Sequence, residues 1–186
     1  MRRTLVSSCL ALAAAAASFL AAPAHACTAS PMSMDVMADH AAQVVIGEVT
    51  MIRSYWTEDG RAIESEITLT GVEYLKGRRA DSRSVMTLKV PGGTVGSITM
   101  RLCCVPEIQA GERYAMFLLP EYRTYPTVGM AQGLFKIERD EDGRDRVLSA
   151  NGLAIAGLDQ QGMPFTIVQR GSELARTRLV GENGAS

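Results

Sequence analysis

The residues best placed to do chemistry stand at the predicted start of the mature chain, Cys27-Thr28-Ala29-Ser30-Pro31. A cysteine at the first position would carry a free α-amine. One interpretation is that this amine and the cysteine itself form the functional site of the molecule. An exported protein whose signal simply ends before Cys27 is an equally weighted interpretation. A bacterial lipoprotein is disfavoured, because its signal needs a large aliphatic residue where Ala24 stands.

Residues 1–26 have the composition of a secretory signal peptide. Arg2 and Arg3 form a basic n-region, an apolar stretch follows over residues 5–22, and Ala24-His25-Ala26 supplies the small-x-small cleavage pattern. The apolar stretch is long enough to span a bilayer, but its Ala-rich composition and the cleavage motif favour removal over anchoring. We therefore expect a mature chain of 160 residues, one domain in length, that is secreted or periplasmic.

The charge balance excludes some function classes. The chain has 19 Lys and Arg against 20 Asp and Glu, a net charge of −1, and loss of Arg2 and Arg3 would make it −3. Nothing in this balance points to nucleic acid or to a membrane surface once the signal is removed. The mature chain would hold one histidine, His40, which removes most zinc sites and most Ser-His or Cys-His triads. We therefore expect no enzyme activity and no cofactor.

Three cysteines remain after the leader is removed: Cys27, Cys103 and Cys104. A bridge between neighbouring cysteines is strained and rare, so we expect Cys27 to pair with Cys103 or Cys104, leaving one thiol over. In the chain-entropy model such a bond constrains the unfolded state by about 4–5 kcal/mol. It would also fix a chain terminus that would otherwise fray.

The elements that must position these residues are mostly short strands. Ser33 is a possible N-cap for a short helix over 33–40, and a weaker helix is expected over 172–178. Asp59-Gly60 and Asp142-Gly143 are hairpin-turn signals. Apolar and polar alternation and β-branched residues predict strands over 43–52, 62–75, 84–90, 96–102, 113–119, 128–130, 134–139, 146–149, 153–156 and 165–168. Short strands with long, uneven connections predict a small closed or partly open barrel.

Four motifs follow one another between residues 27 and 119. They are Cys27-Thr28-Ala29-Ser30-Pro31, then Val44-Val45-Ile46-Gly47-Glu48-Val49, then Ser65-Glu66-Ile67-Thr68-Leu69 leading to Lys76-Gly77, and finally Leu102-Cys103 followed by Gly111-Glu112-Arg113-Tyr114-Ala115-Met116-Phe117. In order and spacing they resemble the tissue inhibitor of metalloproteinases family and the wider netrin-like modules. The first motif matches the family's Cys-Thr-Cys-Val-Pro opening at three of five positions.

The resemblance implies a mainly β fold, a five-stranded OB-like (netrin-like) barrel over residues 27–150, with one or two short helices. Residues 151–186 would then be a C-terminal strand extension and a flexible tail. The resemblance also implies that Cys27 pairs with Cys103.

The function implied by the resemblance is inhibition of a secreted zinc metalloprotease. In that family the α-amine and carbonyl of the first cysteine, here Cys27, chelate the protease zinc. Thr28 would enter the specificity pocket. The rest of the protease-binding surface would be Ala29, Ser30 and Pro31, beside Arg101, Leu102 and Cys103.

The chain also departs from the family pattern. Ala29 stands where the family has its second cysteine, no cysteine lies near Asp39, and the family's cysteine-rich second half has no counterpart. The alternative expectation is therefore a non-inhibitory netrin-like extracytoplasmic protein-binding module, with Cys27–Cys103 as a structural staple. Met32, Met34 and Met37 are most simply core residues, and a soft-metal site is the minor alternative.

Overall fold

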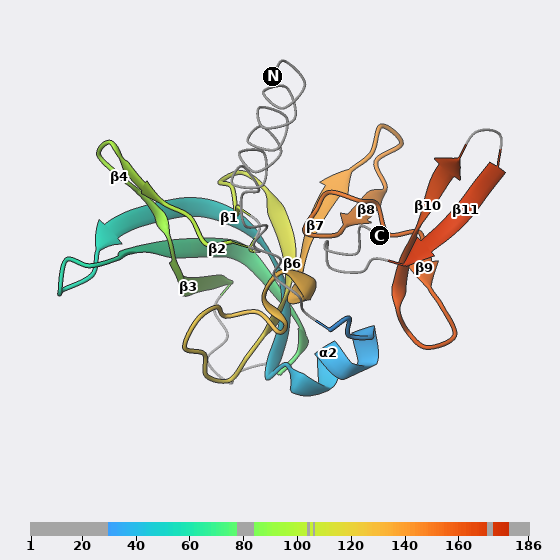
Figure 1. Cartoon of the computed structure of the whole chain (residues 1–186), viewed down its shortest axis with the longest axis horizontal. Coiled ribbons are helices and arrows are strands. Elements are labelled where there is room, and N and C mark those ends of the chain that lie inside the picture. The colour runs from blue at the N-terminus through green and yellow to red at the C-terminus, as the bar shows by residue number, and fades with distance from the viewer. Residues whose placement is uncertain (1–29, 78–83, 104, 106, 171–172, 179–186) are drawn as a thin grey trace, which may run out of the picture.

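The computed structural model describes residues 30–77, 84–103, 105, 107–170 and 173–178. The predicted signal peptide and Cys27 lie outside the described residues. The chain is mainly β, as predicted, with one short α-helix among the described residues (Figure 1). The elements are α2 (Met34–His40), β1 (Gln43–Trp56), β2 (Ile63–Lys76), β3 (Val85–Pro91), β4 (Gly93–Val95), β5 (Ile98–Met100), β6 (Arg113–Leu118), the 3₁₀ helix η2 (Met130–Gly133), β7 (Leu134–Arg139), β8 (Asp145–Leu148), β9 (Gly157–Leu158), β10 (Pro164–Arg170) and β11 (Glu173–Arg178).

The largest unit is a six-stranded antiparallel sheet in the order β3-β2-β1-β6-β7-β8. Strand β1 pairs along its length with β2 and, over its first residues, with β6 on its other side. Register shifts in the β1–β2 pairing are irregularities that bend and twist strands, and both strands curve strongly (Figure 1). The main apolar cluster of the sheet, called the main cluster below, consists of Val45, Val49, Ile67, Leu69, Val90, Tyr114, Met116, Leu118, Tyr125 and Leu134.

The β1–β2 hairpin forms as the sequence predicts. In β2, residues Ile63, Ser65, Ile67 and Leu69 are buried while the residues between them are partly exposed, which is the period-2 pattern of a half-buried strand. At the turn, Asp59 accepts hydrogen bonds from the Thr57 hydroxyl (2.6 Å) and from the Arg61 N–H (3.2 Å). The predicted turn between these strands is therefore confirmed.

The predicted closure into a barrel is not seen. Strands β3 and β8 are the two ends of the sheet, and no strand pairing joins them within the described residues. The reason is that the strands available for closure are paired elsewhere. Strand β4 leaves the line of β3 at Gly92-Gly93 to pair with β5, and β7 pairs with β6 on one side and β8 on the other.

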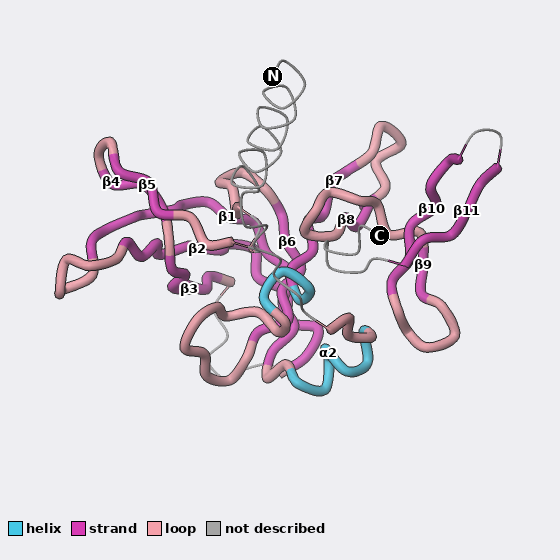
Figure 2. The backbone as a smooth tube through the Cα atoms, viewed as in Figure 1, coloured by secondary structure: helices cyan, strands magenta, loops and turns pink. Residues whose placement is uncertain are grey.

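Three predicted elements are wrong. Residues 153–156 do not form a strand, because only Ala154 makes an isolated bridge, to Leu148, and β9 begins at Gly157. Residues 128–130 do not form a strand, because Gly129 and Met130 have φ of 59° and 57° and begin η2 instead. Residues 173–178 form β11, not a helix, because they pair in antiparallel register with β10 (Figure 2). The predicted strand over 96–102 is shorter, β5, and the glycine-rich stretch before it contains β4.

The helix over 33–40 is confirmed as α2, and the Ser33 hydroxyl accepts a hydrogen bond from the Val36 N–H (3.3 Å). Met37 of α2 is buried in a second apolar cluster with Val44 and Phe135, against which Met32 and Met34 pack. The methionines therefore serve core packing. Among the described residues, no helix is long and apolar enough to cross a membrane.

The C-terminal strands form a separate three-stranded sheet in the order β11-β10-β9 (Figure 1). Two backbone hydrogen bonds between described residues help to hold this region against the rest of the molecule. The Ile155 N–H donates to the Val147 carbonyl of β8 (2.8 Å), and the Met34 N–H donates to the Gly162 carbonyl (2.9 Å). The second bond fixes the start of α2 to the β9–β10 turn.

Candidate functional site

The first described residues, Ser30 to Met32, are held by one side chain. The Gln132 amide Nε2 donates to the Ser30 carbonyl (3.0 Å), and its Oε1 accepts from the Met32 N–H (2.8 Å). A carbonyl and an N–H two residues apart are the groups that a neighbouring strand would pair with. The Gln132 carboxamide therefore holds the main chain of this segment as a short β-partner would. We call Ser30-Pro31-Met32 the N-terminal segment.

The turn that carries Gln132 is closely packed. At Gly129 a Cβ would lie 2.3 Å from the Met32 Cε, so glycine lets the Met32 thioether reach the turn. At Gly133 a Cβ would lie 2.6 Å from the Val128 carbonyl oxygen. Met130 has a positive φ, and the Thr127 hydroxyl donates to its carbonyl. These close contacts give Gln132 a fixed position from which to hold the N-terminal segment.

The structure describes only some of the residues predicted to bind a protease. Cys27, Thr28 and Ala29 lie outside the described residues, whereas Ser30 and Pro31 are exposed beside Gln132. The other predicted residues follow β5. Arg101 is exposed and forms an ion pair with Glu107 (3.7 Å), and Cys103 is exposed.

Leu102 is half-buried. A Cβ on Gly92 would lie 3.4 Å from its Cδ1, so Leu102 packs where β3 gives way to β4. Leu102 is thus positioned at the junction of β3 and β4, whereas Ser30 is held by Gln132 of η2. The pairing of Cys27 with Cys103 or with Cys104 involves residues outside the described part of the chain.

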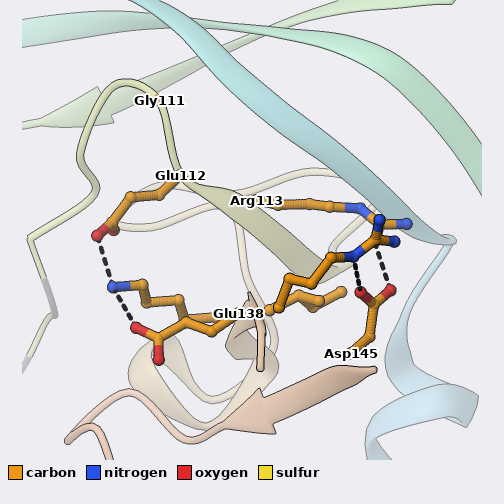
Figure 3. A pocket seen from close by; sticks show the side chains of 8 residues that line it. Gly111, Glu112, Arg113, Glu138 and Asp145 are labelled. Atoms are coloured by element: carbon orange, nitrogen blue, oxygen red, sulfur yellow. Dashed lines mark hydrogen bonds and ion pairs between the residues drawn. The ribbon is translucent and has the colours of Figure 1, made fainter. Parts of the chain in front are cut away.

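A polar pocket that the sequence analysis did not predict opens at the β6–β7–β8 side of the sheet (Figure 3). Lys136 Nζ lies between Glu112 Oε1 (2.6 Å) and Glu138 Oε1 (2.7 Å). Beside this group, the Asp145 carboxylate binds the guanidinium groups of Arg113 and Arg139. The pocket is lined by Gly111, Glu112, Arg113, Lys136, Ile137, Glu138, Arg139 and Asp145.

The charges in this pocket satisfy one another. Partial burial raises the pKa of Glu112, but hydrogen bonds from Lys136 and Tyr114 outweigh it and hold the pKa below its ordinary value of 4.5. The hydrogen bonds to Glu112 and Glu138 raise the pKa of Lys136, so its ammonium stays charged. Burial and the bond to Glu112 raise the pKa of Tyr114. The ion pairs that line the pocket therefore link β6, β7 and β8, and we call them the ionic network. Their arrangement is that of a structural network.

The cross-strand register explains why these residues meet. Tyr114 lies opposite Lys136, and Arg139 lies opposite Asp145. Opposite charges on adjacent strands of a predicted hairpin are the sequence signal for the second group. The Glu112–Lys136 contact depends on the pairing of β6 with β7 across a long loop, for which the sequence carries no comparable signal.

Within the described residues, no group of three or more His, Cys, Asp or Glu side chains could hold a metal ion. Comparison of the chain with models of protein families, with curated proteins and with solved structures found no match.

Proposed function

We propose that the mature chain, beginning at Cys27, inhibits a secreted zinc metalloprotease through the α-amine and carbonyl of Cys27. The observation that supports this proposal is the fixed N-terminal segment, whose main chain is bound by Gln132 three to five residues after Cys27. A terminus that is ordered before binding loses less conformational entropy in the complex. A Cys27–Cys103 disulfide would add a second fixed point.

The chemistry of the proposed contact is simple. A catalytic zinc keeps one coordination position for water or substrate, and a neutral amine with the carbonyl of the same residue can replace that water as a five-membered chelate. The α-amine must lose its proton first. With an ordinary pKa of about 7.7–8.0 this deprotonation is easily reached near neutral pH. Thr28 would then enter the specificity pocket, with Ala29, Ser30 and Pro31 along the cleft.

From the signal-peptide pattern of residues 1–26 we propose that the protein is secreted or periplasmic. We also propose that the sheet is an opened form of the netrin-like OB architecture. Two features support this interpretation. Strands β1, β2 and β3 form a meander, and β1 pairs on its other side with β6. OB-type folds are partly open barrels, so an open edge at β3 is compatible with the class.

The proposal predicts that the inhibitor fails when its amine is blocked. We expect a version with one extra Ala before Cys27 to lose inhibition of a protease that the version starting at Cys27 inhibits. Changes to groups that merely support metal ligands cost about 10–100-fold in affinity, so loss of the ligand itself should exceed about 100-fold. The measurement is the inhibition constant against a panel of secreted zinc metalloproteases.

The matched control carries the extra Ala at the C-terminus, and intact mass establishes the N-terminus and the disulfide of each version. Equal inhibition by the two N-terminal versions would contradict chelation by the amine. Inhibition by neither version would leave the non-inhibitory netrin-like binding module as the function to pursue.

A further inference from the structure

We propose that Gln132 is a positioning residue for protease binding, and that the edge of the N-terminal segment facing away from it is the edge that meets the partner. This inference rests on the proposed function and adds a residue that the family resemblance does not supply. It is carried by two hydrogen bonds of one carboxamide, which donates to the Ser30 carbonyl and accepts from the Met32 N–H.

The geometry assigns the two edges of the segment. In extended backbone, the carbonyl of one residue and the N–H two residues later point to the same side, and the groups of the residue between them point to the other. Gln132 binds the Ser30 carbonyl and the Met32 N–H, so the Pro31 carbonyl faces away from it. Proline has no N–H, so this outer edge offers an acceptor and no competing donor at Pro31. It therefore suits a cleft that binds extended polypeptide through its own N–H groups.

The segment is held from a second direction by Met32. Its side chain packs against the cluster that contains Met37 and Val128, and its Cε lies over Gly129. The main chain on one side of Pro31 and the side chain on the other are therefore both fixed to the same turn. Loss of the Gln132 amide would leave the Met32 thioether in place but release the Ser30 carbonyl, nearest to Cys27.

Two substitutions separate the contributions of the carboxamide. Gln132→Ala removes both hydrogen bonds. Gln132→Glu keeps an acceptor for the Met32 N–H but removes the donor to the Ser30 carbonyl. Gln43→Ala is the matched control, because Gln43 Nε2 also donates to a distant carbonyl, that of Gly77 (3.3 Å), in an exposed position.

The experiment uses the mature protein beginning at Cys27 and two measurements on each variant. The first is hydrogen exchange of the Met32 amide, which reports the Gln132 contact without any protease. The second is the inhibition constant against a zinc metalloprotease that the unsubstituted protein inhibits. We expect Gln132→Ala to speed Met32 exchange at least about tenfold and to weaken inhibition about tenfold, equal to about 1.4 kcal/mol. Gln132→Glu should weaken inhibition while slowing Met32 exchange relative to Gln132→Ala, and Gln43→Ala should change neither.

Unchanged inhibition in Gln132→Ala, with or without faster Met32 exchange, would overturn the positioning role while leaving the proposed function intact. Unchanged Met32 exchange in that variant would overturn it as well. If the unsubstituted protein inhibits no protease, the proposed function fails and the positioning role fails with it. Thermal unfolding of each variant establishes that it is folded, and Gln132→Glu keeps the test valid if Gln132→Ala is not.

Discussion

At the scale of single residues, Lys76 and Gly77 show how two adjacent residues join three elements. Lys76 Nζ donates to the Ala38 carbonyl (2.5 Å) of α2. Gly77 has a φ of 72° and lies so close to the Ala42 carbonyl that a Cβ there would be 2.0 Å from its oxygen. The end of β2 is thereby fixed to the connection between α2 and β1, and only glycine fits at residue 77.

We predict that Gly77→Ala destabilises the protein by more than about 2 kcal/mol, because overpacking against backbone adds to the strain of a left-handed residue. Gly60→Ala is the control. Gly60 has a similar φ of 67° but nothing within 4 Å of the added Cβ, so its substitution should cost about 1 kcal/mol. Urea unfolding of both variants measures the difference, and equal destabilisation would contradict the contact with Ala42.

At the scale of elements, the ionic network holds the far half of the sheet together. Glu112 precedes β6, Lys136 lies on β7, and Asp145 begins β8 (Figure 3). The Glu112 side chain is 22% exposed, against 49% for Glu138. Of the two carboxylates that bind Lys136, Glu112 should therefore contribute more to stability, since water screens it less.

We predict that Glu112→Gln lowers the free energy of unfolding by about 1 kcal/mol at pH 7. The folded-state pKa of Glu112 lies below its ordinary value of 4.5, so its contribution is complete above that pH. As the pH falls through the lowered folded-state pKa, the contribution is lost and the two proteins converge in stability. Urea unfolding at several pH values between about 7 and 3 measures this convergence. Glu138→Gln serves as the control with a smaller effect, and a difference independent of pH would contradict the role of the carboxylate.

The elements also show what the sequence could predict. The strands predicted over 62–75 and 134–139 lie within about one residue of β2 and β7. In the first half of β2 one buried face imposes alternation on the sequence. In β7, Leu134 and Phe135 are both buried, one in each apolar cluster, and the strand shows instead as a short apolar run. Residues 173–178, Glu-Leu-Ala-Arg-Thr-Arg, include good helix formers, but pairing with β10 overrides that local preference. The contacts of Gln132 with Met32 and Ser30 could not be predicted from the sequence. The two partners precede Gln132 by 100 and 102 positions, and no local sequence pattern marks such a contact.

At the scale of the whole molecule, the prediction of a mainly β fold is confirmed but the prediction of a closed barrel is not, because strand content does not determine whether a sheet closes. The strand inventory is compatible with a barrel, yet closure depends on which edges remain unpaired after β4 and β8 have found partners. The two apolar clusters also differ in which parts of the chain contribute to them. Among the described residues, none after residue 150 belongs to the main cluster, whereas Ile155 packs against the second cluster.

We predict that a chain ending at Ala150 still unfolds cooperatively, with a melting temperature lower by roughly 5–10 °C. It keeps the main cluster but loses the Ile155 side chain and the Gly162 acceptor of the Met34 N–H. Calorimetry measures the transition, and hydrogen exchange should show faster exchange at Met34 with little change in β1. Ile155→Ala in the full chain is the control for the packing loss alone. Loss of the cooperative transition would contradict the independence of the main cluster.

The loop after β6 reaches across to the open end of the sheet, where the Tyr122 hydroxyl donates to the Lys89 carbonyl of β3 (2.9 Å). An end strand with unpaired backbone groups and an exposed Val85 is a template on which other copies of a chain can aggregate. Tyr122 occupies one acceptor on that strand, and the charged Lys89 stands at the same position. Together they oppose strand-to-strand aggregation at the open end of the sheet.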